Sequence, residues 1–257
     1  MKPQRLDLVY TIAWETRWHV GSGFDSAAAD RLIRRYGSEK GSRKGPPFVP
    51  GSQLKGVLRH QCERLALALG ADAVDPHATS ESQQRHLVQH FRPLGESELL
   101  VDRLFGSRYQ GECLFVDNAL PATEGTQFTS LRTRTALDRV TGTVLERHLF
   151  TTELAEGDNV VLQGHVRARH PPGVLTVFDE GVPYEYALLI AAMLSIDSLG
   201  GDKSAGLGRC RVSILGDQVM WNGQALSVDT VLSSFEEFAD EDWAAWIREV
   251  RREGGQE

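Results

Sequence analysis

The sequence has few cysteines, few lysines and no long hydrophobic run. Its three cysteines, Cys62, Cys113 and Cys210, are odd in number and far apart, so they predict no disulfide framework. No uninterrupted apolar run approaches the roughly 20 residues of a transmembrane helix, and the N-terminus lacks the apolar core of a signal peptide. We therefore expect a cytoplasmic protein with no membrane partner.

The chain also lacks an overall positive charge, because 28 basic and 35 acidic residues give a net charge of −7. That total argues against a nucleic-acid binder. However, residues 217–257 hold ten acids and three bases, so residues 1–216 are neutral. The first 59 residues hold eleven bases and five acids, and the whole chain has 23 Arg against 5 Lys. Arginine suits phosphate recognition, although a GC-rich genome also favours it, so the acidic total does not exclude RNA.

The hydrophobic pattern predicts one large α+β domain. Alternating or β-branched runs predict strands at residues 6–18, 113–118, 159–169 and 209–215. Apolar residues at three- and four-residue steps predict helices at 52–70 and 184–199. The order strand, helix, strand, strand, helix, strand indicates a ferredoxin-like (RRM-like) antiparallel sheet with helices.

Three further segments complete the expected organisation. Residues 71–98 are polar and predict an inserted lid region, and residues 119–150 predict an exposed β-hairpin, the thumb, that turns at Thr141-Gly142. We expect residues 1–216 to form the domain and residues 217–257 an acidic extension. Its amphipathic helix, which includes Trp243 and Trp246, packs on its own domain or docks on a neighbouring subunit.

The segment 50–59 (PGSQLKGVLR) is the first candidate binding element. We expect Ser52 to cap a helix whose free N–H groups and dipole favour an anion. Lys55 and Arg59, four residues apart, lie on one face of this helix and would add positive charge. The spacing is not that of a Walker loop. The segment is either an anion site or a capped helix with two solvated bases.

The segment 200–209 (GGDKSAGLGR) is the second candidate. Its four glycines let the backbone approach a ligand closely, and Lys203, Ser204 and Arg209 can donate to phosphates. It follows a predicted helix and precedes a predicted strand, which is the reverse of the dinucleotide-binding order. An extended polyanion therefore fits this loop better than a mononucleotide does.

Together these segments resemble the RAMP superfamily (repeat-associated mysterious proteins) of CRISPR systems. Residues 50–59 are similar to its helix-start motif and residues 200–209 to its glycine-rich loop, in the same order. Residues 103–107 and 115–119 resemble the stretch between these motifs. Residues 138–142 resemble the family's thumb segment. The resemblance spans about residues 6–215 and is closest to backbone subunits of type III effector complexes, which polymerise along CRISPR RNA.

The resemblance implies contacts to guide RNA from the first loop, the helix, the thumb and the glycine-rich loop. The implied residues are His19, Gly21, Ser22, Gly23, Ser52, Lys55, Arg59, Arg139, Lys203, Ser204, Gly206, Gly208 and Arg209. In relatives the thumb wedges between bases and flips out one nucleotide at regular intervals, so Arg139 is expected at that position.

The resemblance also implies a catalytic aspartate in some relatives, which cut target RNA from the loop after the first glycine motif. Asp30 is the closest match, and Asp25 is the alternative. A carboxylate could organise attack by a 2′-OH, and Arg31, Arg34 and Arg35 could neutralise the developing charge. Other relatives only bind, cap the complex or process the guide, and the sequence leaves these roles open.

We expect a metal ion only as an aid to RNA cleavage, not as a structural element. Many relatives hold zinc just before residues 103–107, but this chain has no cysteine there, so we predict no structural zinc. His77, His86 and His90 are better explained as exposed residues of the insertion. A divalent ion such as Mg²⁺ could assist cleavage. The expected partners are CRISPR guide RNA, complementary target RNA, copies of this chain and other CRISPR effector subunits.

Overall fold

The computed structural model describes residues 3–37, 44–71, 73, 99–107, 111–122, 129–156, 160–171, 175 and 182–233. The expected insertion at 71–98, its histidines and the aromatic residues of the C-terminal extension lie almost wholly outside these ranges. No helix in the described part is both long enough and apolar enough to span a membrane.

The main sheet is antiparallel and forms the palm of the molecule. Its strands include β1 (Gln4–Trp14), β2 (Leu114–Val116), β6 (Val161–His170) and β7 (Cys210–Ile214), arranged in the order β2-β6-β1-β7. Helix α1 (Gly51–Ala68) follows β1, and helix α4 (Tyr184–Leu194) follows β6. This βαββαβ order confirms the predicted ferredoxin-like fold.

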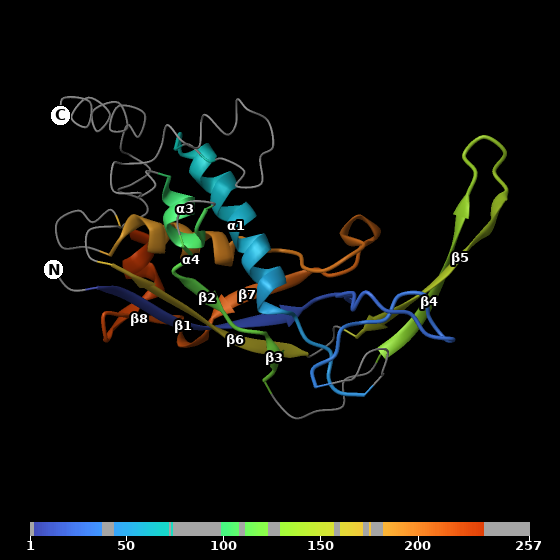
Figure 1. Ribbon diagram of the computed structural model, residues 1–257, viewed down its shortest axis with the longest axis horizontal. Helices are drawn as coiled ribbons and strands as arrows, with labels where there is room; N and C mark the ends of the chain where they lie inside the picture. Colours follow the sequence, from blue (N-terminus) through green and yellow to red (C-terminus); the bar gives the residue numbers. More distant parts are fainter. Residues whose placement is uncertain are drawn as a thin grey trace.

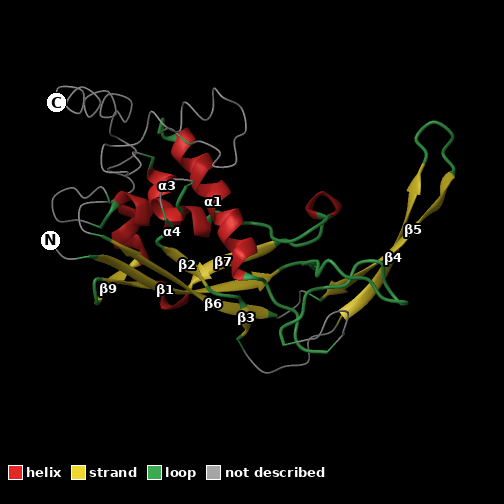
Figure 2. Cartoon of the chain, viewed as in Figure 1, coloured by secondary structure: helices red, strands yellow, loops and turns green. Residues whose placement is uncertain are grey.

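Alternation along β1 explains why the helices cover one face of the sheet (Figures 1 and 2). The even-numbered residues Leu6 to Trp14 are all buried, whereas the odd-numbered ones are exposed or half-buried. Leu54, Leu58 and Cys62 of α1 are fully buried against that face. The short helix α3 (Leu100–Phe105) completes the helical layer, and no helix of the described residues covers the opposite face of the sheet.

The expected thumb is present as a two-stranded sheet that projects away from the palm (Figure 1). Strand β4 (Thr129–Leu137) pairs with β5 (Val144–Ala155), with an irregularity between Thr135 and Leu137. The turn spans residues 138–143, and Gly142 there has a φ of +69°. The segment before the hairpin belongs instead to the palm, because β3 (Leu120–Pro121) pairs with β6.

The palm continues past residue 216, where we expected an extension to begin. Strand β8 (Gln218–Trp221) pairs with β1, and β9 (Gln224–Ser227) pairs with β8 through a tight turn. Asn222 and Gly223 both have positive φ at this turn, as a two-residue hairpin requires. Residues 228–233 are helical, and Val228 and Val231 enter the main core.

Candidate functional site

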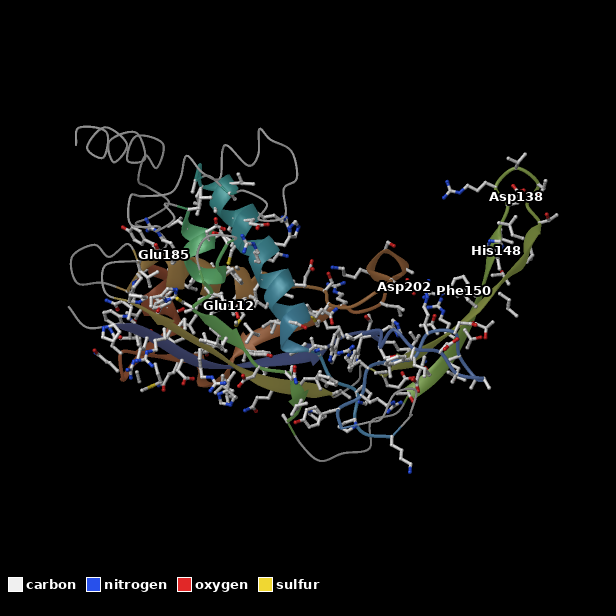
Figure 3. The ribbon with its side chains drawn as sticks, in the orientation of Figure 1. Glu112, Asp138, His148, Phe150, Glu185 and Asp202 are labelled. Carbon is white, nitrogen blue, oxygen red and sulfur yellow. The ribbon has the colours of Figure 1, made fainter. Side chains whose placement is uncertain are left out.

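The first loop, the glycine-rich loop and the base of the thumb meet at one place, which we call the junction. It comprises residues 19–36, residues 200–209 and the thumb residues 132–134 and 150–153. Figure 3 shows Asp202 and Phe150 here, while Asp138 marks the far end of the thumb and Glu112 lies on the palm. Of the two segments that carry the family resemblance, residues 200–209 lie at the junction, whereas residues 50–59 lie at the start of α1 on the palm.

Asp202 links the three parts of the junction. Arg134 Nη1 of the thumb donates to Asp202 Oδ2 at 3.0 Å, and Arg31 Nη1 lies 3.8 Å from Asp202 Oδ1. The Arg31 guanidinium carbon also lies 5.3 Å from the ring centroid of Phe150, within the range of a cation–π contact. Asp202 adopts the left-handed conformation (φ 56°), which aims the start of the glycine-rich loop at the thumb.

Glu153 fixes the first loop to the thumb from inside the protein. Its carboxylate is fully buried and accepts from Arg35 Nη2 at 2.9 Å, from Ile33 N at 3.2 Å and from Thr129 Oγ1 at 3.3 Å. The Arg35 side chain is 7 % exposed. A buried charge of this kind requires its partners, so the pair rigidly defines the floor of the junction.

Asp30 lies on the exposed side of the same loop. Its backbone N donates to Thr151 O at 2.9 Å, and its Oδ2 accepts from Thr151 N at 2.6 Å. The loop therefore runs beside β5, and Arg31 forms a bridge with Thr152 there. Asp25, the alternative, is exposed in the preceding turn, next to Ser26. Asp30 is the better positioned of the two, because it is held at the thumb base.

His19 joins the first loop to the glycine-rich loop. Its Nδ1 lies 2.8 Å from the carbonyl oxygen of Glu153, and its own carbonyl accepts from Gly201 N at 2.8 Å. The side chain is 6 % exposed. A Cβ on Gly200 would overlap the His19 carbonyl, so glycine permits this close approach. His19 thus offers little surface to a ligand.

Gly21, Ser22 and Gly23 form the turn after His19. Ser22 Oγ donates to Leu32 O at 3.0 Å and accepts from Phe24 N at 3.2 Å, so this hydroxyl holds the turn. Gly23 has a φ of +81°, and a Cβ added to it would have no neighbour within 4 Å, which leaves its backbone open to solvent. A ligand would meet the turn at its backbone.

The glycine-rich loop presents its polar groups outward. Lys203 and Ser204 are exposed on a single 3₁₀ turn, and Gly206 is exposed with a φ of +81°. Gly208 is instead buried against the carbonyl of Leu199, and its N donates to Arg17 O at 2.8 Å. Arg209 is exposed and pairs with Glu15 at 2.9 Å.

Helix α1 uses its basic residues within the protein. Lys55 Nζ pairs with Glu112 and donates to Leu114 O at 3.0 Å. Arg59 donates to Asp102 Oδ1 at 2.7 Å and to Gly106 O at 2.8 Å. Both residues remain predicted RNA contacts. Their positive charge is, however, already paired within the protein with the carboxylates of Glu112 and Asp102.

The start of α1 also differs from the expectation. Pro50 is the N-cap residue, so the prediction that Ser52 is the cap is wrong. Ser52 is the exposed second residue of the helix. Gly51 packs against the carbonyl of Val116, and its N donates to Asn118 Oδ1 at 2.9 Å. The Asn118 side chain thus satisfies one of the free N–H groups at the start of the helix.

Arg139 follows Asp138 in the turn at the tip of the thumb, and Figure 3 shows Asp138 far from Asp202 and Phe150 of the junction. The preceding Asp138 accepts from Val140 N at 2.7 Å and from Thr141 N at 3.4 Å. These backbone hydrogen bonds lower the pKa of Asp138 below its usual value, because they favour the carboxylate. The turn is therefore fixed by Asp138, and Arg139 is exposed beside it.

Sequence reasoning missed Arg134, Phe150 and Asp202 as parts of one site. Asp202 stood inside the glycine-rich motif, but only the fold brings it to a thumb arginine 68 positions away. The alternation of Arg132 and Arg134 along a strand was the available signal, since both lie on one face of β4. Phe150 carried no such signal.

The described residues contain no group of three or more His, Cys, Asp or Glu side chains that could hold a metal ion. At the junction, Asp202 is paired with Arg134 and Arg31, whereas Asp30 is exposed at the base of the thumb. Magnesium is commonly bound by one or two carboxylates together with substrate phosphates. Asp30 fits that limited role.

The comparison with protein families agrees with the geometry. A family model described as the RAMP superfamily matches residues 11–211, which include the end of β1, α1, the thumb, β6 and the glycine-rich loop. No curated protein matches the chain.

The match begins within β1 and ends within β7, so it covers most of the ferredoxin-like palm and the whole junction, but not β8 and β9. It also confirms the resemblance inferred from the two glycine-containing segments at the level of the superfamily. The chain belongs to the RAMP superfamily and is a CRISPR-associated RNA-binding protein.

Proposed function

We propose that the chain is a guide-binding backbone subunit of a type III CRISPR effector complex. It assembles side by side with copies of itself along the guide RNA, in the cytoplasm. The observation that carries this proposal is the junction, where Asp202 draws the glycine-rich loop, the first loop and the thumb together. Such a surface can hold an RNA backbone beside a projecting hairpin that divides the bound strand into segments.

The binding chemistry follows from the exposed donors. Lys203, Ser204 and the open backbone at Gly206 lie on one side of the junction, and Arg132 extends the same face of β4 as Arg134. Arginine and lysine side chains and backbone N–H groups are the usual partners of phosphate oxygens. At the tip of the thumb, Arg139 is positioned to meet bases displaced from the strand.

We further propose that Asp30 cleaves target RNA held at the junction. Its carboxylate would accept the proton of a ribose 2′-OH, and the 2′-oxygen would attack the adjacent phosphorus. The P–O5′ bond would then break, and the leaving 5′-oxygen would take up a proton from water. The products are a 2′,3′-cyclic phosphate and a 5′-hydroxyl. Arg31, the next residue of the chain, is held by Phe150 and Asp202 and would stabilise the negative charge on the phosphorane oxygens.

Thr151 sets the orientation of this carboxylate. Because Oδ2 already accepts from the Thr151 backbone, Oδ1 is the oxygen that we assign to the substrate. If Mg²⁺ takes part, Asp30 would be its carboxylate ligand, and the ion would polarise the phosphate.

One observation favours a binding-only subunit as the second candidate. The hydrogen bond between Asp30 Oδ2 and Thr151 N is also the bond that a purely structural aspartate would make to fix the loop. In that case the junction holds RNA, and no group on it takes the proton.

The test is cleavage of guide-complementary RNA by the assembled complex with Asp30→Asn. This change keeps the shape of the side chain and its acceptor oxygen for Thr151, but removes the base. We expect cleavage to fall at least about a hundredfold while guide binding is unchanged.

Asp25→Asn is the matched control, since it alters the neighbouring exposed aspartate, and it should cleave like the wild type. Full cleavage by Asp30→Asn would remove the catalytic assignment and favour the binding-only subunit. Loss of guide binding in that variant would instead show a structural role.

A further inference from the structure

The open face of the palm sheet carries a group of arginines that the junction does not use. The odd-numbered residues of β1 and β6 point to this face, because their even-numbered neighbours are buried under the helices. Arg5 and Arg169 lie directly opposite each other across the β1–β6 pair, and both are exposed. Asp7 and Arg167 form the next such pair on this face.

The Arg5–Arg169 pairing is unfavourable by itself. Like charges directly opposite each other on neighbouring strands destabilise a sheet. Within the part of the chain that the structure describes, neither guanidinium has an ion-pair partner. Arg167 bonds to both oxygens of Asp117, at 2.8 and 2.9 Å, so Asp7 is the carboxylate of β1 that remains beside the pair. The positive charge of Arg5 and Arg169 therefore favours the binding of an anionic ligand on this face.

An aromatic ring lies beside the arginines. Phe115 of β2 pairs with Arg167 in the sheet register and is 53 % exposed. On the other side of β1, Met220 of β8 is the register partner of Asp7, and it is 43 % exposed. Exposed aromatic rings next to arginines on an open sheet form the stacking surface that single-stranded nucleic acids use.

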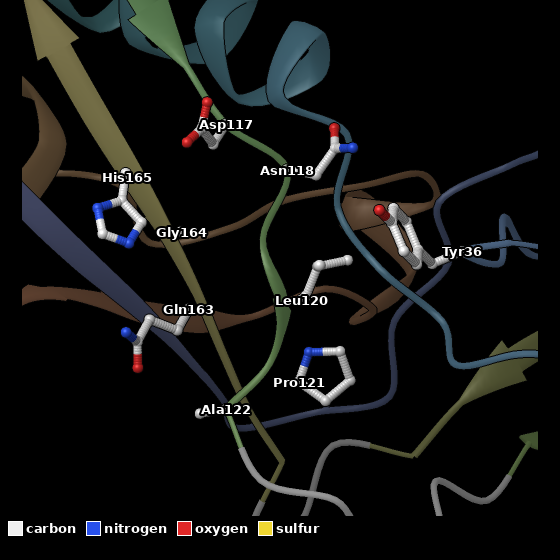
Figure 4. A pocket seen from close by; sticks show the side chains of 9 residues that line it. All are labelled: Tyr36, Asp117, Asn118, Leu120, Pro121, Ala122, Gln163, Gly164 and His165. Carbon is white, nitrogen blue, oxygen red and sulfur yellow. The ribbon is translucent and has the colours of Figure 1, made fainter.

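A hollow of about 490 Å³ adjoins this face at the edge formed by β3 and β6 (Figure 4). Its lining includes the ring of Tyr36, the imidazole of His165 and the amides of Asn118 and Gln163. Asn118 Oδ1 already accepts from Gly51 N, so its amide N–H groups are left for a ligand. The lining therefore combines rings with amide donors and acceptors, which suits the edge of a nucleobase.

We infer that the open sheet face is a second RNA-binding surface, which takes a single-stranded segment outside the junction. Phosphates bind Arg5 and Arg169, one base stacks on Phe115, and another enters the hollow beside Tyr36. This inference rests on the RNA binding proposed above, but it assigns a different face of the palm.

An acidic protein segment would satisfy the arginines as well, but it would not account for the other features. A carboxylate-rich helix needs neither the exposed ring of Phe115 nor a hollow lined by amides. RNA uses all three groups at once, so we assign this surface to RNA. The experiment below distinguishes RNA from the acidic C-terminal residues of this chain as the occupant.

The first test measures the affinity of the full-length protein for a short labelled oligouridine over a range of salt. Arg5→Ala/Arg169→Ala should weaken binding several-fold and reduce the slope of log affinity against log salt by about 1.4, since each lost phosphate contact on a single strand removes about 0.7. Arg64→Glu is the matched control. It changes the net charge by the same amount on the exposed side of α1, and it should keep the wild-type slope.

The second test replaces Phe115 by the photocrosslinking residue p-benzoylphenylalanine. A crosslink from position 115 to the oligouridine supports the inference. A crosslink from position 115 to residues 234–257 of this chain, or an unchanged salt slope for Arg5→Ala/Arg169→Ala, would overturn it. If only the proposed RNA binding at the junction is wrong, substitutions at the junction will leave the RNA affinity unchanged. The crosslink from position 115 to the oligouridine will still form in that case.

Discussion

At the residue scale, two glycines of one loop have the same backbone conformation for different reasons. Gly206 and Gly208 have φ values of +81° and +78°. Gly206 has open space where a Cβ would be, whereas a Cβ on Gly208 would overlap the carbonyl oxygen of Leu199. Gly206 therefore needs glycine only for its backbone angle, and Gly208 needs it also for close packing.

This difference predicts unequal costs of the same substitution. Gly206→Ala should lower the free energy of unfolding by about 1 kcal/mol, which is the cost of a left-handed conformation. Gly208→Ala should lower it by about 3 kcal/mol or more, because the backbone must also move. Urea unfolding of both variants measures the costs, and equal values would contradict the assigned packing of Gly208.

The ion-pair partners of Lys55 and Arg59 could not be predicted from the sequence. The spacing of Lys55 and Arg59 predicted two bases on one helix face, and they do share the helix. Their partners Glu112 and Asp102 lie 57 and 43 positions further along the chain, so no local pattern could reveal that these charges are satisfied within the protein.

At the element scale, the first loop is held to the thumb like an additional strand. Residues 30–33 run beside β5, and the buried pair of Arg35 and Glu153 closes this arrangement from inside. Just outside these two elements, Arg17 and Glu156 form a more exposed pair, 2.9 Å apart. Burial should make the first pair far more important than the second.

We therefore predict a large difference between two glutamate substitutions. Glu153→Ala leaves the Arg35 guanidinium buried and should lower the free energy of unfolding by about 3–5 kcal/mol. Glu156→Ala, the matched exposed control, should change it by less than about 1 kcal/mol. Chemical denaturation tests both variants, and a small effect of Glu153→Ala would mean that the loop is not anchored through this pair.

The elements differ in how far the sequence predicts them. Strand β1 and helix α1 were predictable because Leu6 to Trp14 alternate and Leu54, Leu58 and Cys62 follow the helical period. The β8–β9 hairpin was missed, although Asn222-Gly223 is a hairpin signal, because the acidic composition of the region suggested an appendage. The junction was predicted only in its parts, since Asp202, Arg31 and Arg134 meet through tertiary contacts.

At the scale of the whole molecule, the charge is distributed by face and by segment. The net charge of −7 resides in residues 217–257, whereas exposed arginines gather at the junction and on the open sheet face. The total charge therefore says little about the RNA-binding role, because phosphate contacts depend on the local arrangement of bases.

The salt dependence of RNA affinity tests whether RNA crosses the junction, as proposed above. Arg132→Ala/Lys203→Ala removes two exposed bases from opposite sides of the junction and should reduce the slope of log affinity against log salt by about 1.4. Arg64→Glu is the control, because it changes the net charge by the same amount on the exposed side of α1, and it should leave the slope unchanged. An unchanged slope for Arg132→Ala/Lys203→Ala, or an equal reduction for Arg64→Glu, would contradict the assignment of the junction as the RNA-binding site.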